Sequence, residues 1–174
     1  MTKSSGVVQS FETIYRRFAP AVMGYLRARG VEDPEAVTQE VFISVLPKIG
    51  KISGGEDGVR ILLFSIAHAR AVDHQRRRAH TIPTVEYDPD QDERFSTSAE
   101  DIALAQSHQE ATLAILSALT ADQREVLLLR VVADLPLDQV AKVMGKSVGS
   151  IKQLQRRALL ELREHPDLAE VRFP

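Results

Sequence analysis

Apolar residues recur every three or four positions along most of the chain, which predicts amphipathic helices separated by short turns. The first such pattern begins at Phe11. Pro20 falls inside it and should bend or restart the helix. Gly30 suits the end of this helix, and Asp33 suits the N-cap of the next one. That second helix should cover about residues 34–46, because Pro34 favours a first helical turn and Pro47 cannot continue one.

The middle of the chain contains one long helical pattern followed by a stretch without any period. Glycines predict a loop over residues 51–58, and a helix should follow over about 59–78 and end in three consecutive arginines. Residues 82–98 hold two prolines and a cluster of Asp, Ser and Thr, which is typical of a linker. Helical spacing returns over about 99–118, where Ser98 can cap the first turn.

Three further helices are predicted over about residues 121–132, 137–144 and 148–164. Thr120 can cap the first of them, and Gly145 permits the tight turn between the second and the third. The last two therefore form a helix-turn-helix. Small, polar and basic residues remain on the outer side of the last helix: Ser147, Gly149, Ser150, Lys152, Gln153, Arg156 and Arg157.

This outer side has the chemistry needed to bind duplex DNA. Amides at a helix N-terminus and serine hydroxyls can hold phosphate, and small residues let the backbone approach it. Gln153 and an arginine can reach base edges in the major groove. Helical hairpins with glycine turns also occur in proteins that bind no DNA, so the shape alone leaves both interpretations open.

Composition narrows the class of protein. The chain has 174 residues, of which 44% are apolar, so it can bury a real core, and residues that favour helices dominate, which predicts an all-α fold. It has no cysteine, which excludes disulfides, thiolate zinc sites and a cysteine nucleophile. No apolar stretch approaches the roughly 20 residues that span a bilayer, and the N-terminus lacks a signal-peptide pattern. We therefore expect a cytoplasmic protein without membrane insertion.

Charge is segregated along the chain although the formal net charge is only −2. Residues 76–80 and 142–157 are basic, whereas residues 85–101 carry seven acidic residues against one arginine. The basic helix around residues 62–78 could hold single-stranded nucleic acid or could simply be a core helix with a charged end. The amphipathic helix "EAVTQEVFISV" (35–45) presents either a partner surface or an ordinary solvated face.

Three segments together resemble a bacterial sigma factor of the extracytoplasmic-function (ECF) group. "VTQEVF" (37–42) is similar to the D-x-x-Q-E-x-F segment of sigma region 2, and "LFSIAHARAVDHQRRR" (63–78) is similar to the helix with the I-A-x-N and D-x-x-R-R-x-R patterns. Residues 119–162 resemble region 4 over their whole length. The resemblance implies two small helical bundles, region 2 at residues 8–81 and region 4 at 99–166, joined by a flexible acidic linker at 82–98.

The family also implies partners and sites, and it implies neither an enzyme activity nor a cofactor or metal. The partners would be core RNA polymerase, through its β′ clamp helices and β flap, promoter DNA, and an anti-sigma factor that holds the protein inactive. The implied polymerase contacts are Thr38, Gln39, Glu40 and Phe42. The implied contacts to the minus-ten element are Arg60, His68, Arg70, His74, Arg76, Arg77 and Arg78. The implied contacts to the minus-thirty-five element are Lys146, Ser147, Ser150, Lys152, Gln153, Arg156 and Arg157.

The chain departs from the family pattern at three positions of the front segments. Ala36 stands in the acidic part of the first motif, Leu62 stands where a tryptophan is frequent, and Ala69 replaces the asparagine of I-A-x-N. The last two positions lie near bases in the family, so strand capture here should be weaker or differently specific.

Two other classes of protein would each explain part of the sequence. A helix-turn-helix regulator that binds duplex DNA as a dimer would explain the rear of the chain but would leave its first 80 residues without a task. A helical metal enzyme would have to use His68, Asp73 and His74. The two histidines are six positions apart, so they lack the i, i+4 spacing of paired ligands on one helix.

Overall fold

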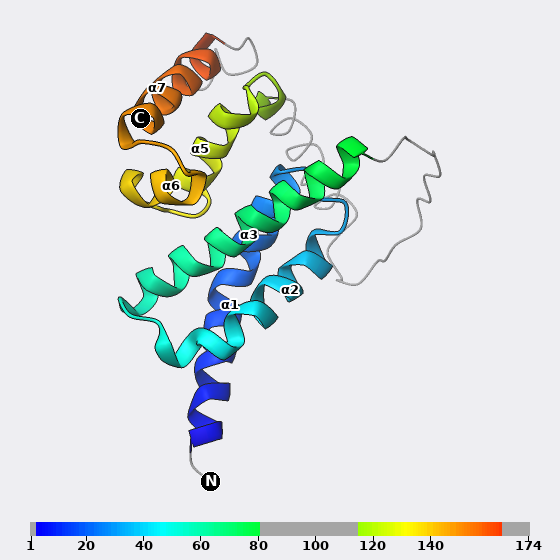
Figure 1. Ribbon diagram of the computed structural model, residues 1–174, viewed down its shortest axis with the longest axis vertical. Helices are drawn as coiled ribbons and strands as arrows, with labels where there is room; N and C mark the ends of the chain where they lie inside the picture. Colours follow the sequence, from blue (N-terminus) through cyan, green and yellow to red (C-terminus); the bar gives the residue numbers. More distant parts are fainter. Residues whose placement is uncertain (1–2, 81–114, 165–174) are drawn as a thin grey trace, which may run out of the picture.

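The computed structural model describes residues 3–80 and 115–164, and both parts are helical, without strands (Figure 1). The front bundle consists of α1 (Lys3–Ala28), α2 (Pro34–Val45), the 3-10 helix η1 (Leu46–Lys51) and α3 (Gly55–His80). The rear bundle consists of α5 (Ala121–Val131), α6 (Leu137–Met144) and α7 (Val148–Glu164). The all-α fold is thus confirmed. The predicted linker at 82–98 and most of the predicted helix at 99–118 lie outside the described residues, although 115–117 are helical.

Aromatic side chains fill much of the core of the front bundle. Phe42 of α2 is fully buried and lies edge-on to Phe11 and Tyr15 of α1, with ring centroids 6.2 and 4.8 Å apart. Tyr25 of α1 meets Phe64 of α3 at 5.7 Å with perpendicular rings. Such edge-to-face contacts add to the burial of large apolar surfaces, so they hold α1, α2 and α3 in fixed positions.

The predicted helix boundaries in the front bundle need two corrections. Helix α1 continues through Pro20 without restarting, although proline removes one backbone hydrogen bond. Phe18 and Val22 are both buried on either side of Pro20, and we attribute the uninterrupted helix to this packing. Helix α3 begins at Gly55, within the stretch predicted as a loop. The N-cap at Asp33 is confirmed, since its Oδ1 accepts the Ala36 N–H at 2.8 Å.

A close backbone approach explains Gly58 at the start of α3. A Cβ atom placed on Gly58 would lie 2.0 Å from the carbonyl oxygen of Ser53 and 2.9 Å from a methyl group of Ile52. Only glycine fits against the backbone at this distance. The turn before α3 is therefore held by contact as well as by the glycines at positions 54 and 55, which have positive φ.

In the rear bundle, local signals place the helices where the sequence predicts them. Thr120 and Gln123 form a reciprocal capping box at the start of α5. Gly145 has φ 63° and ends α6 in the left-handed conformation expected for this turn. The core contains only aliphatic side chains among its buried apolar residues: Leu119, Val126, Leu127, Leu128, Leu129, Ala133, Leu135, Val140, Ala141, Ile151 and Ala158.

The two bundles pack against each other in the described structure. Helix α5 contacts α1, and α6 contacts α3, so the rear bundle lies against the side of the front bundle that α1 and α3 form (Figure 1). Most buried apolar residues of both bundles form one continuous cluster, while Leu119, Leu127 and Ala158 form a second, smaller one within the rear bundle.

Candidate nucleic-acid interface

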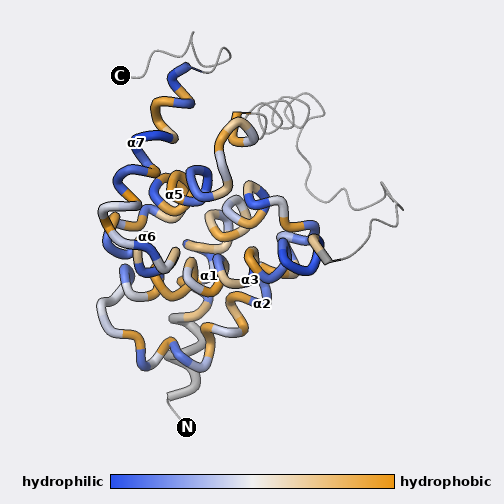
Figure 2. The backbone as a smooth tube through the Cα atoms, turned by 45° about the horizontal axis from the view of Figure 1, so that its top comes forward, coloured by the Kyte–Doolittle hydropathy of each residue, from blue (hydrophilic) through white to orange (hydrophobic). Residues whose placement is uncertain are grey.

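Helix α7 presents one exposed polar and basic face. Ile151 and Ala158 are buried against the rest of the rear bundle, while Leu154 and Leu162 are partly buried. Lys152, Gln153, Arg156 and Arg157 are all exposed, and Figure 2 shows hydrophilic residues along much of this helix. Because 152 and 156, like 153 and 157, are four positions apart, these side chains form two adjacent rows. The sequence predicted this orientation.

The serines at the N-terminus of α7 form a cap on its first turn. Ser147 Oγ accepts the Ser150 N–H at 3.1 Å, and the two hydroxyl oxygens are 2.9 Å apart. Lys146, which precedes them, forms an ion pair with Asp122 at 3.0 Å. Gly149 adds no bulk, since a Cβ there would meet only Ser147 Oγ, at 3.9 Å. The positive end of the helix dipole is therefore exposed among small residues, an arrangement suited to a phosphate group.

Arg60 and His68 of α3 contact the rear bundle. Arg60, at the first of the predicted minus-ten positions, pairs with Asp134 of the rear bundle at 3.1 Å and with Glu56 at 3.2 Å. His68 Nδ1 lies 2.8 Å from Glu125 Oε1, which also belongs to the rear bundle. Two of the predicted strand-binding side chains are thus occupied by carboxylates.

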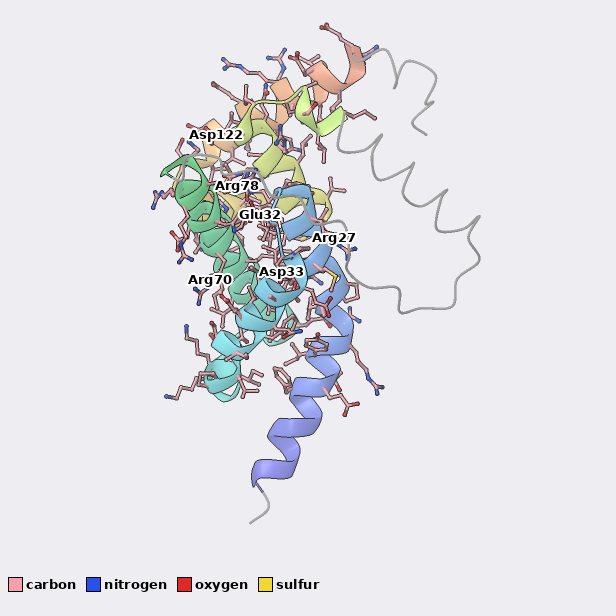
Figure 3. All side chains as sticks on the ribbon, turned by 90° about the vertical axis from the view of Figure 1, so that its right-hand side faces the viewer. Arg27, Glu32, Asp33, Arg70, Arg78 and Asp122 are labelled. Carbon is pink, nitrogen blue, oxygen red and sulfur yellow. The ribbon has the colours of Figure 1, made fainter. Side chains whose placement is uncertain are left out.

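The second half of α3 carries the remaining predicted strand-binding side chains, and three of these contact the α1–α2 turn or α2. Arg70 lies 3.7 Å from Glu40 of α2, and Arg78 pairs with Glu32 at 3.3 Å (Figure 3). His74 Nε2 accepts the backbone N–H of Glu32 at 3.3 Å. The other two predicted cations are exposed on the last turns of α3, at Arg76 and Arg77.

The structure corrects part of the predicted polymerase surface on α2. Gln39 and Glu40 are exposed, as expected. Thr38 is fully buried and donates its hydroxyl to the Pro34 carbonyl at 2.6 Å, and Phe42 belongs to the aromatic core. Neither side chain is on the surface, because α2 turns both toward α1 and α3. Sequence reasoning missed Ile43, which is 68% exposed beside Gln39 and Glu40.

Sequence reasoning also missed a charged cluster between the bundles. Glu125 of α5 is only 2% exposed and lies 2.7 Å from the guanidinium of Arg29, itself 6% exposed. Tyr25 donates its hydroxyl to the same carboxylate at 2.5 Å. The signal that could have been noticed is the position of Glu125, three and four residues before the buried Leu128 and Leu129.

The described residues contain neither a cluster suited to a metal ion nor a helix suited to a membrane. No group of three or more His, Asp or Glu side chains in residues 3–80 and 115–164 is placed to hold a metal ion. Among these same residues, no helix combines the length and apolar character that crossing a membrane requires.

Known proteins resemble this chain in sequence and in fold. The family "Sigma-70, region 4" matches residues 115–164, which contain α5, α6 and α7. The ECF RNA polymerase sigma factor BldN of Streptomyces coelicolor is 30% identical over 91% of this chain, and the chain spans 61% of that protein's length. The ECF sigma factor SigX of Bacillus subtilis is 25% identical, with 92% of this chain and 85% of SigX covered.

A solved structure shares the arrangement of helices. The sigma factor RpoE of Bartonella quintana, crystallised with the anti-sigma factor NepR, has a TM-score of 0.65 and 21% identity, covering 94% of this chain and 99% of RpoE. This likeness shows the fold. In sequence, the rear bundle matches region 4 of the sigma-70 family, and most of the chain is similar to ECF RNA polymerase sigma factors.

Proposed function

We propose that this protein is a sigma factor that binds bacterial core RNA polymerase in the cytoplasm and directs promoter recognition, promoter melting and transcription initiation. The observation that carries the proposal is the exposed basic face of α7 inside the segment that matches sigma-70 region 4. In this assignment residues 99–166 read the minus-thirty-five element, and residues 8–81 bind polymerase and the minus-ten element.

The α7 face is suited to the major groove of duplex DNA. Gln153 and Arg157 can reach base edges, while Lys152 and Arg156 can neutralise phosphate beside them. The formal net charge of −2 is compatible with this role, because polymerase supplies much of the affinity for DNA in such an assembly.

The polymerase contact in this proposal is the exposed side of α2. Gln39 and Ile43 are four positions apart on that side, and Leu46 follows them at 45% exposure. An exposed isoleucine surrounded by polar groups is the kind of anchor that protein interfaces bury. The proposed polymerase surface therefore differs from the one that the sequence predicted. It includes Ile43 and Leu46 and leaves out Thr38 and Phe42, which are buried.

Transcription reconstituted from purified core polymerase and a genomic DNA library tests the function directly. We expect added protein to produce transcripts with a shared sequence upstream of their start sites. Binding of the purified protein alone, as a dimer on palindromic half-sites, would instead favour a regulator that acts without polymerase.

Replacing Gln39 and Ile43 by alanine tests the polymerase surface. We expect at least about tenfold weaker binding to core polymerase, since interface anchors each contribute about 1–2 kcal/mol or more. Arg16→Ala, at an exposed position of α1, is the control and should bind as the unmodified protein does. Equal affinity of all three proteins would move the polymerase contact away from α2.

An anti-sigma factor is a further proposed partner. The solved relative RpoE was crystallised with NepR, and CnrH, with a TM-score of 0.61 and 21% identity, was crystallised with the cytosolic domain of CnrY. By analogy, a protein of this kind would bind this chain and block its access to polymerase or DNA.

A further inference from the structure

The contact between the two bundles contains a buried carboxylate with three partners. Glu125 of α5 reaches Arg29 at 2.7 Å, Tyr25 at 2.5 Å and His68 at 2.8 Å, and all three partners belong to the front bundle. Burial and the nearby Glu125 charge raise the pKa of Tyr25, so this side chain remains a hydroxyl donor. A carboxylate that crosses between bundles in this way is buried at a considerable desolvation cost.

The buried ion pair between Arg29 and Glu125 lacks part of its hydrogen bonding. Arg29 Nε and Glu125 Oε2 are close enough for an ion pair, but neither atom has a hydrogen bond of acceptable geometry within the described residues. Separating the bundles would return both charges to water. The contact is therefore favourable only while all of its partners are present, because a single buried charge without its partner is strongly unfavourable. This property is expected of an interface that has to open.

A second carboxylate of the rear bundle also pairs with a side chain of the front bundle. Asp134, in the turn after α5, pairs with Arg60 of α3. Together, Glu125 and Asp134 contact Arg60 and His68, which are the two predicted strand-binding side chains of α3 that face the rear bundle. In the proposed function those side chains hold a promoter strand. The carboxylates thus occupy the positions that DNA phosphates would take.

The packed arrangement is also too short to reach both promoter elements. Their names place them about 25 base pairs apart, which is roughly 85 Å of B-DNA. Here Asp134 touches α3, and α7 follows after only one intervening helix of eight residues, about 12 Å long. The front and rear bundles must therefore separate before α3 and α7 can bind the two elements together.

We propose that the packed bundles are a closed state that blocks promoter binding, locked by Glu125 against Arg29, Tyr25 and His68 and by Asp134 against Arg60. This inference rests on the proposed sigma function. Binding to polymerase or DNA must separate the bundles, so the free-energy cost of opening lowers the apparent affinity for the promoter.

Glu125→Gln tests the lock, with Glu12→Gln as the matched control. Both substitutions remove one negative charge, but Glu12 lies in an exposed pair with Arg16 at the other end of the front bundle. We expect Glu125→Gln to raise the radius of gyration in small-angle X-ray scattering. It should also bind a fluorescent single-stranded (dT)20 oligonucleotide about tenfold or more tightly than Glu12→Gln does. Tyr25→Phe, which keeps the ring packed on Phe64, should show smaller changes in the same direction.

A covalent trap provides the converse experiment. The chain has no cysteine, so cysteines placed at Asp57 and Gln139, which line one cavity of about 360 Å³ between the bundles, can be joined selectively by a bismaleimide. The joined protein should lose at least about tenfold in (dT)20 binding relative to the same variant left unjoined. Equal binding by both forms would overturn the closed state.

Transcription with core polymerase separates this inference from the proposed function. If the unmodified protein initiates transcripts but Glu125→Gln changes neither its size nor its (dT)20 affinity, only the closed state is overturned. If Glu125→Gln expands and no variant initiates transcription, the sigma function fails and the promoter-blocking role fails with it. Circular dichroism of Glu125→Gln and Tyr25→Phe checks that each retains the helical content of the unmodified protein.

Discussion

The two bundles build their cores from different side chains. The front bundle buries Phe18, Tyr25, Phe42 and Phe64, whereas the described rear bundle contains no aromatic residue and packs leucine, valine and isoleucine. Large rings contact several helices at once, so the front bundle is fixed by contacts between residues far apart in sequence. The rear bundle relies on caps and turns that act between neighbours. The front bundle is therefore specified by contacts between distant segments, and the rear bundle largely by local signals.

Phe42→Ala should produce the largest effect and would show how far the front bundle depends on its aromatic core. Removing a fully buried ring that contacts Phe11 and Tyr15 should lower the free energy of unfolding by about 3–5 kcal/mol. Urea denaturation followed by circular dichroism measures this. Ile43→Ala, on the next and exposed position, should change stability by less than about 1 kcal/mol. Similar losses for both variants would contradict the placement of Phe42.

The double substitution Arg156→Ala and Arg157→Ala tests whether the rear bundle binds promoter DNA while the front bundle binds polymerase. Each arginine lost from a DNA contact should cost about 1–3 kcal/mol, so promoter binding by the holoenzyme should weaken at least about tenfold. Affinity for core polymerase should remain unchanged, because that contact is proposed for α2. Arg163→Ala, at the far end of α7, is the control. Loss of polymerase binding in the double variant would break the division of roles between the bundles.

The same difference between local and long-range contacts decides how much of each bundle could be predicted from the sequence. The bounds of α6 and α7 agree with the prediction, because Pro136, Gly145 and Ser147 act on their immediate neighbours. The burial of Thr38 could also have been read from its helix, because Thr38 lies three and four positions before the buried Val41 and Phe42. The family resemblance instead placed Thr38 among the polymerase contacts. The exposed face of α7 could be derived from periodicity within one helix.

The charged contact between the bundles shows the limit most clearly. Tyr25 and Glu125 are 100 positions apart, and nothing in either segment specifies the other. The helical spacing around Glu125 could have predicted that its side chain is buried. Its partners could not be predicted, because they depend on how the two bundles pack together.

Two glycines with opposite surroundings provide a finer test. Gly58→Ala in the front bundle forces a methyl group against the Ser53 carbonyl and should destabilise the protein by about 1–3 kcal/mol. Gly149→Ala in the rear bundle places its methyl group in nearly open space, so it should be neutral or stabilise by up to about 1 kcal/mol. Thermal unfolding of both variants measures the difference. Equal shifts would mean that the turn before α3 is looser than the contact indicates.

The smallest expected losses of stability come from substitutions at the two N-caps. These substitutions compare the local signals of the two bundles directly. Asp33→Ala removes a single side-chain acceptor at α2, whereas Thr120→Ala breaks one half of a reciprocal capping box at α5. Each should cost about 0.5–2 kcal/mol. We expect the larger loss at Thr120, because its removal also leaves the Gln123 side chain without the geometry that the box imposes, and because the small rear core has less apolar contact to compensate. Hydrogen exchange of the first-turn amides of α2 and α5 reports each cap separately. A greater loss of protection at α2 than at α5 would show that the front bundle, too, depends chiefly on its local signals.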